Sequence, residues 1–253
     1  MTSYLITGAS RGLGLAIATE LAALPESEAS IIFATTRQHN PGSLKDLAVS
    51  TSGRVVPVQL DPNDPESLSA AVKLVEDRLQ GKGLDVLVNN AGTQPVTDGK
   101  VEMADDLTET FHVNVTLTHY VTRAFLPLLR KGEHKMISNI SSTVGSIAQA
   151  PKYQMSPTHA YKVSKAAMNM LTIQYALQYA DEGFSVFAIS PGWLKTELGG
   201  SYADLPVEVG AKEVVRYIRS GGRDLNGRFL NIHVPGWENA PGPNQYDGKD
   251  VPW

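Results

Sequence analysis

Short apolar runs alternate with longer amphipathic segments along the whole chain. Seven runs have the length and composition of strands, at residues 4–7, 30–36, 55–60, 84–89, 135–140, 184–189 and 228–232. The amphipathic segments predict helices over residues 12–24, 64–79, 105–129, 160–179 and 207–219. Repeated strand–helix alternation requires right-handed crossovers between parallel strands. The pattern therefore predicts an α/β protein, a Rossmann-type doubly wound parallel sheet of about seven strands with helices on both faces.

Some stretches interrupt this alternation. Pro57 falls inside the third strand, where its missing N–H is tolerated only at an unpaired position. A proline-containing loop over residues 148–159 comes directly before Tyr161, and a Pro/Gly-rich tail spans residues 235–253. Both segments carry aromatic side chains, so we expect ordered loops beside the site rather than linkers. Without a repeat or a boundary, residues 1–253 are expected to form a single dinucleotide-binding catalytic domain.

Composition narrows the functional classes. The 253 residues, 42% of them hydrophobic, allow one substantial core, and the net charge of -4 without a basic block argues against nucleic-acid binding. No run approaches the roughly 18 apolar residues of a membrane span, and the N-terminus does not read as a signal peptide. We therefore expect a cytoplasmic protein. The six histidines, His39 among them, show no paired metal-ligand spacing, so they are interpreted as surface or packing residues and no metal is expected.

A glycine loop follows the first strand and opens the first helix. Gly8, Gly12 and Gly14 have the spacing G-x-x-x-G-x-G, which differs from the G-x-G-x-x-G of many dehydrogenases. Glycine lets the backbone turn sharply and approach a pyrophosphate, which then sits at the helix N-terminus. In this strand–loop–helix setting the loop predicts a dinucleotide site. The other loop residues expected to contact the cofactor are Ser10, Arg11 and Leu13.

The end of the second strand indicates which dinucleotide binds. Thr36 and Arg37 stand where an acidic residue would accept hydrogen bonds from the adenosine ribose and select NAD. Two guanidinium groups, those of Arg37 and Arg11, and a hydroxyl suit a 2′-phosphate, so NADP (NADPH) is preferred. The alternative is that both arginines are solvated. Asp61, which closes the third strand, either accepts from the adenine amino group or is a turn residue before Pro62.

Two further turns close strands on the cofactor side. The amide-rich turn at residues 89–92 leaves room for the adenosine ribose and ties neighbouring strands together by hydrogen bonds. After the sixth strand, a Pro-Gly pair turns the chain, and the segment that follows could hold the nicotinamide carboxamide through the Leu194 backbone and the Thr196 hydroxyl. The expected cofactor contacts in these turns are Asn90, Ala91, Gly92, Pro191, Gly192, Leu194 and Thr196.

Tyr161 and Lys165 are one helical turn apart, which places both side chains on the same helix face. A nearby ammonium favours phenolate, so the spacing predicts a pKa of Tyr161 below its ordinary value of about 10. Such a phenol can exchange a proton with a substrate oxygen while a bound cofactor carries the hydride. Taken alone, the pair is equally compatible with an ordinary helix surface.

Together and in this order, these motifs resemble the short-chain dehydrogenase/reductase family over essentially the whole chain. The matching residues are Thr7, Gly8, Gly12, Gly14, the turn at 89–92, Asn114, Ser142, Tyr161, Lys165, Pro191, Gly192 and Thr196. The segments 190–200 and 247–253 are most similar to the C-factor-like and sniffer-like carbonyl reductases and to ketoreductases of aromatic polyketide pathways. The resemblance implies an oxidoreductase, an NADPH-dependent carbonyl reductase.

The resemblance also implies a catalytic tetrad of Asn114, Ser142, Tyr161 and Lys165. In reduction, Tyr161 donates a proton to the carbonyl oxygen, and Ser142 hydrogen-bonds the same oxygen. Lys165 lowers the Tyr161 pKa and binds the nicotinamide ribose, and Asn114 holds a water that links Lys165 to solvent. The family pattern N-I-x-S points to Ser142, with Ser141 as the alternative. The loop at 148–159 makes the separation of serine and tyrosine longer than is usual in the family.

The aromatic residues expected to rim the site are Tyr153, Trp193, Tyr202 and Trp237. They favour a bulky, apolar or aromatic ketone, aldehyde or quinone as the small-molecule substrate, and the short segment 197–206 suggests an open pocket. The alternatives are an NAD-linked alcohol dehydrogenase and a non-catalytic dinucleotide-binding sensor on the same fold. By analogy with the family, the helices over 105–129 and 160–179 are expected to support a homodimer or homotetramer.

Overall fold

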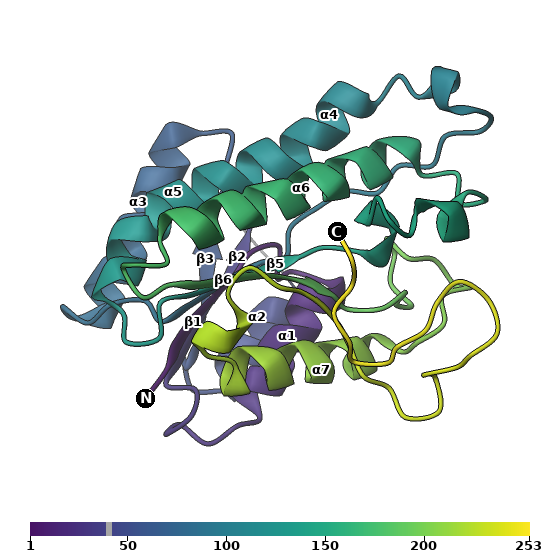
Figure 1. Cartoon of the computed structure of the whole chain (residues 1–253). Coiled ribbons are helices and arrows are strands. Elements are labelled where there is room, and N and C mark those ends of the chain that lie inside the picture. The colour runs from purple at the N-terminus through teal and green to yellow at the C-terminus, as the bar shows by residue number, and fades with distance from the viewer. Residues whose placement is uncertain (39–41) are drawn as a thin grey trace.

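The computed structural model describes residues 1–38 and 42–253; His39 lies outside the described residues. Seven parallel strands form one sheet in the order β3-β2-β1-β4-β5-β6-β7 (Figure 1). Their bounds are β1 Ser3–Ile6, β2 Ile31–Thr36, β3 Val55–Gln59, β4 Val86–Asn89, β5 Met136–Ile140, β6 Ser185–Ser190 and β7 Phe229–Asn231. The doubly wound parallel sheet predicted from the apolar runs is therefore confirmed.

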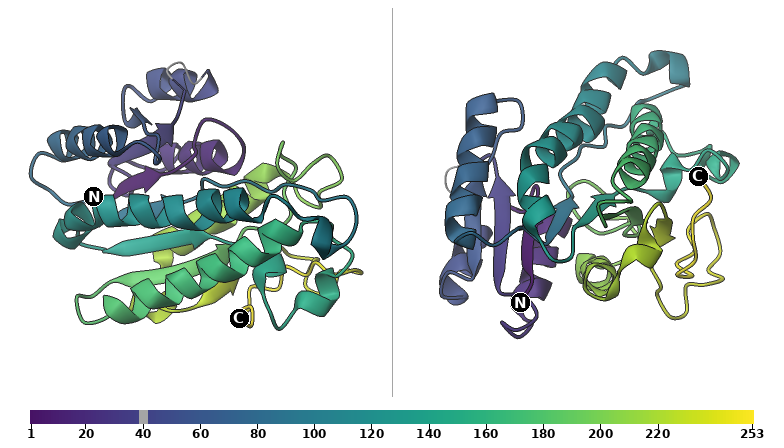
Figure 2. Two further views of the ribbon diagram at one scale, coloured as in Figure 1. Left: turned by 90° about the horizontal axis from the view of Figure 1, so that it is seen from above. Right: turned by 60° about the vertical axis from the view of Figure 1, so that its left-hand side comes forward.

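Helices cover both faces of this sheet (Figures 1 and 2). On one face lie α3 (Pro65–Leu79), α4 (Leu107–Phe111), α5 (Leu117–Lys131) and α6 (His159–Gln178). On the other lie α1 (Gly12–Ala22), α2 (Ser43–Ser50) and α7 (Val207–Ser220). The short 3₁₀ segments are η1 (Val101–Met103), η3 (Thr143–Gly145), η4 (Ala150–Tyr153) and η5 (Arg223–Leu225), and η2 (His112–Thr116) is a π-helical turn.

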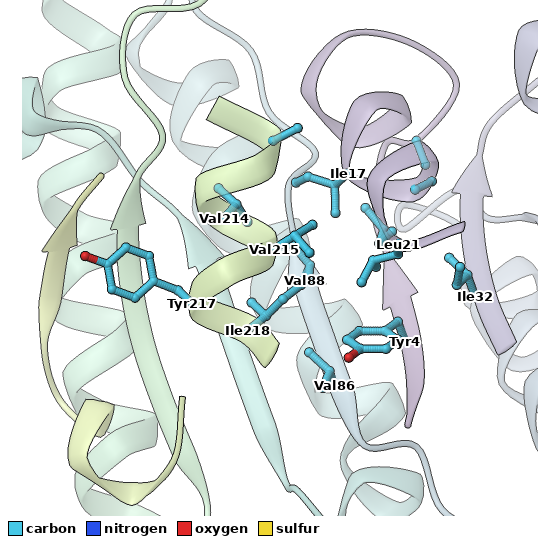
Figure 3. Close-up of a cluster of buried hydrophobic side chains, with 14 of the residues drawn as sticks. Tyr4, Ile17, Leu21, Ile32, Val86, Val88, Val214, Val215, Tyr217 and Ile218 are labelled. Carbon is cyan, nitrogen blue, oxygen red and sulfur yellow. The ribbon is translucent and has the colours of Figure 1, made fainter. Parts of the chain in front are cut away.

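Each face of the sheet carries its own hydrophobic core. Alternate side chains of β1 point to opposite faces, so Tyr4 joins the core beneath α1 and α7, whereas Leu5 joins the core beneath α3, α5 and α6. Figure 3 shows the first core, where Ile17 and Leu21 of α1 meet Ile218 of α7 over the sheet. Because both faces are buried, the strands read as continuous apolar runs rather than alternating ones.

The differences from the predicted elements have local causes. Pro57 lies on β3, which has a neighbour on one side only, and an edge is where a strand tolerates proline. The helix predicted over residues 105–129 is instead α4, the π-helical turn η2 and α5 in succession. Helix α2 was not predicted, because its eight residues bury only Leu44 and so show no apolar stripe.

The C-terminal tail folds back onto the carboxyl edge of the sheet. The Val251 N–H donates to Phe229 O of β7 at 2.7 Å, and the Trp253 ring stacks on Phe229 with centroids 5.2 Å apart. The Ala148 N–H donates to Trp253 O at 3.1 Å, so the tail also supports the segment that follows β5 (Figure 1). The tail and the loop before Tyr161 are thus in direct contact. Of the helices described, none has both the length and the apolar character needed to cross a bilayer.

Candidate active site

The glycine loop after β1 is a main-chain cradle that side chains would fill. Gly8 and Gly12 have φ angles of +65° and +55°, a region that favours glycine. A Cβ built on Gly14 would lie 2.4 Å from Gly8 O, and one on Gly8 would lie 3.0 Å from Ala91 Cα. The loop leads into the N-terminus of α1, where unpaired N–H groups and the helix dipole favour an anion. The cradle therefore fits the pyrophosphate of a dinucleotide, with Ser10 in the loop and Leu13 in the first helical turn.

The turn after β4 is tied to this cradle through Thr7. The Thr7 hydroxyl oxygen accepts from the N–H groups of Asn90 and Ala91 at 2.9 and 3.0 Å, and Asn90 Nδ2 donates to Thr7 O at 2.8 Å. Asn89 Nδ2 donates to Asn139 Oδ1 of the neighbouring strand at 2.8 Å. This turn links strands by hydrogen bonds as its amide content predicts, and it brings Gly92 to the same edge.

The residues expected to surround a 2′-phosphate do not all lie together: Thr36 and Arg37 are at the end of β2, whereas the Arg11 side chain pairs with the segment after β6. Thr36 is buried and its hydroxyl accepts from the Gln38 N–H at 3.0 Å, while Arg37 is exposed beside it. Arg11 instead forms an ion pair with Glu197, from the segment after β6, and both side chains are 73% exposed. At the end of the third strand, Asp61 Oδ1 accepts from the Asn63 N–H at 3.0 Å, as a turn residue would.

The segment after β6 packs against the glycine loop. A Cβ built on Gly12 would lie 3.7 Å from Thr196 Cγ2. The Thr196 hydroxyl accepts from the Gly199 N–H at 3.0 Å, and Leu194 forms a parallel bridge with Leu205. Pro191 is buried, and Gly192 turns the chain with a φ of +88°. The cofactor residues predicted after β1, β4 and β6 therefore lie together at one edge of the sheet.

Tyr161 and Lys165 lie on the buried face of the first turns of α6. The Lys165 Nζ is 5.4 Å from the centre of the Tyr161 ring and donates to Ile140 O, at the end of β5, at 2.7 Å. Close packing makes this possible, because a Cβ built on Gly145 would lie only 2.6 Å from Lys165 Cβ. The pair is thus no ordinary helix surface pair; α6 holds both groups against the strand end.

Burial sets the protonation of both groups. It raises the pKa of Tyr161 to about 12, an effect that the hydrogen bond with Ser142 only partly offsets. It lowers the pKa of Lys165 to about 7, since the charged ammonium loses its hydration. The spacing alone predicts the opposite direction for Tyr161. That prediction was wrong because desolvation of the phenol exceeds the effect of a lysine that is itself desolvated.

The two candidate serines face different surroundings. Ser142 is the hydrogen-bond partner of the Tyr161 phenol, and its hydroxyl also accepts from the Val144 N–H at 3.4 Å. Ser141 is buried and donates to Asn169 Oδ1 at 2.6 Å. The geometry therefore puts the Ser142 hydroxyl beside the phenol and commits that of Ser141 to α6.

Asn114 is fully buried in the π-helical turn η2. Its Oδ1 accepts from the Thr93 N–H at 2.8 Å, and its Nδ2 donates to Thr93 O and to Ser164 Oγ, both at 2.9 Å. A Cβ built on Gly92 would lie 3.0 Å from Asn114 Oδ1 and 3.8 Å from Lys165 Nζ. Both amide hydrogens are thus committed, and the Asn114 side chain holds the chain after β4 beside Lys165.

The expected aromatic rim is only partly at the surface. Trp193 is 40% exposed and Tyr202 is 91% exposed. Tyr153, however, is buried under the tail, and its hydroxyl donates to Pro243 O at 3.2 Å. Trp237 packs against the Tyr246 ring with centroids 5.4 Å apart. The tail covers Tyr153, which is why its predicted place on an open rim was wrong, whereas Trp237, itself a tail residue, is partly buried.

Several residues beside the site went unrecognised in the sequence. Thr93, Ser164 and Asn169 each hold a predicted site residue through a hydrogen bond, and Thr7, matched as part of the glycine motif, holds Asn90. Serine and threonine are common everywhere, so only Thr7, within the glycine motif, carried any signal. Across residues 1–38 and 42–253, no group of three or more His, Cys, Asp or Glu side chains could hold a metal ion.

Comparisons with known proteins agree with this geometry. The family profile described as short chain dehydrogenase matches residues 3–204. The short-chain dehydrogenase anuI of Penicillium roqueforti (strain FM164) is 32% identical over 236 residues, covering 90% of this chain and 92% of that protein. The NADPH-bound carbonyl reductase from chicken fatty liver superposes with a TM-score of 0.84 at 31% identity, covering 100% and 99% of the two chains. The carbonyl reductase Sniffer of D. melanogaster gives 0.86 at 30% identity, covering 100% of both.

Proposed function

Because the chain belongs to the short-chain dehydrogenase/reductase family, we propose that it is an NADPH-dependent carbonyl reductase. In this proposal residues 1–253 act as one catalytic domain on a ketone, aldehyde or quinone. The observation that carries it is the half-buried Ser142 beside the buried Tyr161 and Lys165, with a glycine cradle at the same sheet edge. The likeness to a carbonyl reductase described as NADPH-bound supports the choice of cofactor.

Each residue of the group has a distinct task in reduction. When bound, the reduced nicotinamide supplies the hydride. Tyr161 donates its phenolic proton to the carbonyl oxygen, and Ser142 donates a hydrogen bond to the same oxygen as negative charge develops there. Lys165 binds the nicotinamide ribose hydroxyls, and the committed amide of Asn114 keeps the chain after β4 in place beside it.

The protonation of Tyr161 favours reduction over alcohol oxidation. A pKa of about 12 keeps the phenol protonated throughout the neutral range, and reduction consumes that proton. Alcohol oxidation would need phenolate as the base, which the buried position disfavours. Burial therefore keeps Tyr161 in the protonation state that reduction requires.

The end of β2 supports NADP as the cofactor because no acidic residue lies there. Thr36 and Arg37 close β2, and no carboxylate stands there to accept hydrogen bonds from the ribose hydroxyls. Arg37 is exposed beside the buried Thr36, so its guanidinium can approach a 2′-phosphate without breaking a buried contact. Arg11 can join it only by leaving Glu197.

Trp193 and Tyr202 support a bulky, apolar or aromatic substrate. Both belong to the segment between β6 and α7, which contains the proposed nicotinamide contacts, and both expose aromatic surface.

The exposed stripe of Val163, Met170 and Leu177 along α6, seven residues apart, supports a homodimer, one of the two expected oligomers. Light scattering that gives a monomer mass at micromolar concentration would remove the dimer from the proposal.

The decisive experiment measures NADPH and NADH oxidation at 340 nm across a panel of aliphatic and aromatic ketones, aldehydes and quinones. We expect turnover with NADPH at a higher kcat/KM than with NADH, and faster reduction of aromatic than of small aliphatic substrates. Absence of turnover with every carbonyl compound would contradict the proposed function. A preference for NADH, or for small aliphatic ketones, would contradict only the cofactor or the substrate class.

A further inference from the structure

A tyrosine of the C-terminal tail is buried beneath the segment that joins β6 to α7. It lies at the base of this segment, where residues 193–195 meet residues 204–205. Tyr246 is 3% exposed although it lies in a Pro/Gly-rich stretch. Its ring belongs to a small apolar cluster with Leu194, Leu205 and Ile232, apart from the two main cores. A tail residue thus shares its cluster with the segment proposed to contact the nicotinamide.

The Tyr246 hydroxyl connects the two ends of that segment. It donates to Asp204 Oδ2 at 2.5 Å and accepts from the Trp193 N–H at 3.1 Å. Asn244, also from the tail, donates to the same Asp204 oxygen through its Nδ2 at 2.8 Å. One phenolic oxygen therefore uses both its donor and its acceptor capacity between residues 193 and 204.

Main-chain hydrogen bonds close the same base. The Leu205 N–H donates to Trp193 O at 3.1 Å, and the Lys195 N–H donates to Leu205 O at 2.8 Å. Beyond this base the segment is open, with Tyr202 almost fully exposed. The hydrogen bonds of this segment are thus concentrated where the chain leaves β6, at the residues proposed to hold the nicotinamide. The tail supplies some of these hydrogen bonds.

The backbone of Gly192 lies directly against the Tyr246 ring. A Cβ built on Gly192 would lie 3.3 Å from Tyr246 Cε1 and 3.0 Å from both Leu205 Cδ1 and Ile232 Cδ1. The φ of +88° at Gly192 then directs the chain to Trp193, whose N–H meets the Tyr246 hydroxyl. A shift of the tyrosine would therefore move residues 192–194 with it.

We propose that Tyr246 is a positioning residue that fixes residues 191–196 as the nicotinamide end of the cofactor site. This inference rests on the proposed function. It assigns to the C-terminal tail a role in orienting the reactive ring, with no tail residue in the chemistry itself. Within residues 1–38 and 42–253, Tyr246 forms no hydrogen bond or ring contact with the end of β2, so binding at the adenosine end should not depend on it.

The test compares two ligands by calorimetry on Tyr246→Phe. NADPH reaches both ends of the site, whereas adenosine 2′,5′-bisphosphate occupies only the adenosine end. We expect the Kd for NADPH to rise at least about fivefold, because the Trp193 N–H and the Asp204 carboxylate lose their shared partner. The Kd for the bisphosphate should stay within about twofold of that of the unmodified protein, since nothing at the adenosine end changes.

Tyr217→Phe is the matched control. Tyr217 is also buried, and its hydroxyl donates to Asn231 O at 2.9 Å, but it lies on α7 and belongs to the core cluster of Figure 3 rather than to the cluster of Tyr246. This variant loses a comparable phenolic hydrogen bond without touching residues 191–196. We expect it to bind both ligands as the unmodified protein does.

Asp204→Ala provides a second variant if Tyr246→Phe does not fold. It removes the acceptor of the phenol and leaves the ring packed, so the same selective loss of NADPH affinity is expected. An equal loss for both ligands, or no loss for either, would overturn the inference. A protein that binds the bisphosphate but not NADPH before any substitution would instead overturn the proposed function.

Discussion

The glycine loop after β1 and the group around Tyr161 share one sheet edge but are built in opposite ways. The loop would hold its ligand mainly through backbone atoms. Two of its glycines have a positive φ, the third has no room for a Cβ, and the side chain of Arg11 is exposed to solvent. The Tyr161 group consists of side chains, of which Tyr161 and Lys165 are buried and Ser142 is half-buried, and its phenol and ammonium have pKa values displaced from their ordinary range.

The contrast teaches where each region is sensitive. The loop depends on the absence of side chains at its glycines, so a larger residue there should disrupt it. A change of charge at the exposed rim of the loop should alter the affinity for the cofactor only modestly. The Tyr161 group depends on single buried atoms, so removal of one hydroxyl should alter rate strongly. The two regions can therefore be separated by their responses to small substitutions.

The largest difference between two neighbouring positions is expected from the two adjacent serines. Ser142→Ala removes the hydroxyl beside the phenol and should lower kcat by about 10²–10³, the usual loss for a donor to a developing oxyanion. Ser141→Ala should leave kcat within a few-fold and lower the free energy of unfolding by about 1 kcal/mol, because it leaves Asn169 Oδ1 without its donor. Steady-state kinetics and urea unfolding measure the two effects. Equal losses of kcat in the two variants would contradict the assignment of different roles to Ser141 and Ser142.

A smaller effect is expected from the pH dependence of stability. The Lys165 pKa is about 7 in the folded protein against an ordinary value of 10.5, so between these limits the unfolded chain binds more protons. The free energy of unfolding should therefore rise with pH, by up to about 1.4 kcal/mol per unit. Lys165→Met should remove this rise. We would compare urea unfolding of both proteins from pH 7.5 to 9.0, where tyrosines with an ordinary pKa of about 10 stay largely protonated. Parallel profiles would mean that Lys165 keeps its charge when folded.

The smallest effect belongs to the rim of the glycine loop. Glu197→Gln should free Arg11 for the 2′-phosphate and lower the Kd for NADPH about two- to fivefold, since an exposed ion pair is worth at most about 1 kcal/mol. The Kd for NADH, which lacks that phosphate, should not change. Glu28→Gln is the control, because it breaks the exposed ion pair with Arg219 on α7. Tighter binding of both dinucleotides would show that Glu197 acts on something other than Arg11.

The features that depend on local sequence could be predicted. Apolar runs specified seven strands, and glycine spacing marked the cradle, because backbone conformation follows from residues a few positions apart. The resemblance of ordered motifs to the short-chain dehydrogenase/reductase family is likewise confirmed. The roles of Ser142, Tyr161 and Lys165 stay predictions that the geometry supports.

The features that depend on distant packing could not be predicted. The direction of the Tyr161 pKa shift follows from how β5 and α6 enclose the phenol, which a four-residue spacing does not contain. Tyr153 is turned inward because the tail folds over it, at Pro243, 90 positions later in the chain. Tyr246 stood out only as one aromatic residue in a Pro/Gly-rich segment, and its two hydroxyl partners lie 42 and 53 positions away.

The central claim is that the buried Tyr161 phenol is the proton donor, and Tyr161→Phe tests it most directly. The variant removes one oxygen, and Tyr153→Phe removes a comparable phenolic oxygen held by Pro243 O of the tail. With a carbonyl compound that the unmodified protein reduces, Tyr161→Phe should lower kcat by at least about 10³ while the Kd for NADPH stays within about twofold. Tyr153→Phe should retain most of the activity. Turnover by Tyr161→Phe at a rate close to that of the unmodified protein would contradict the account.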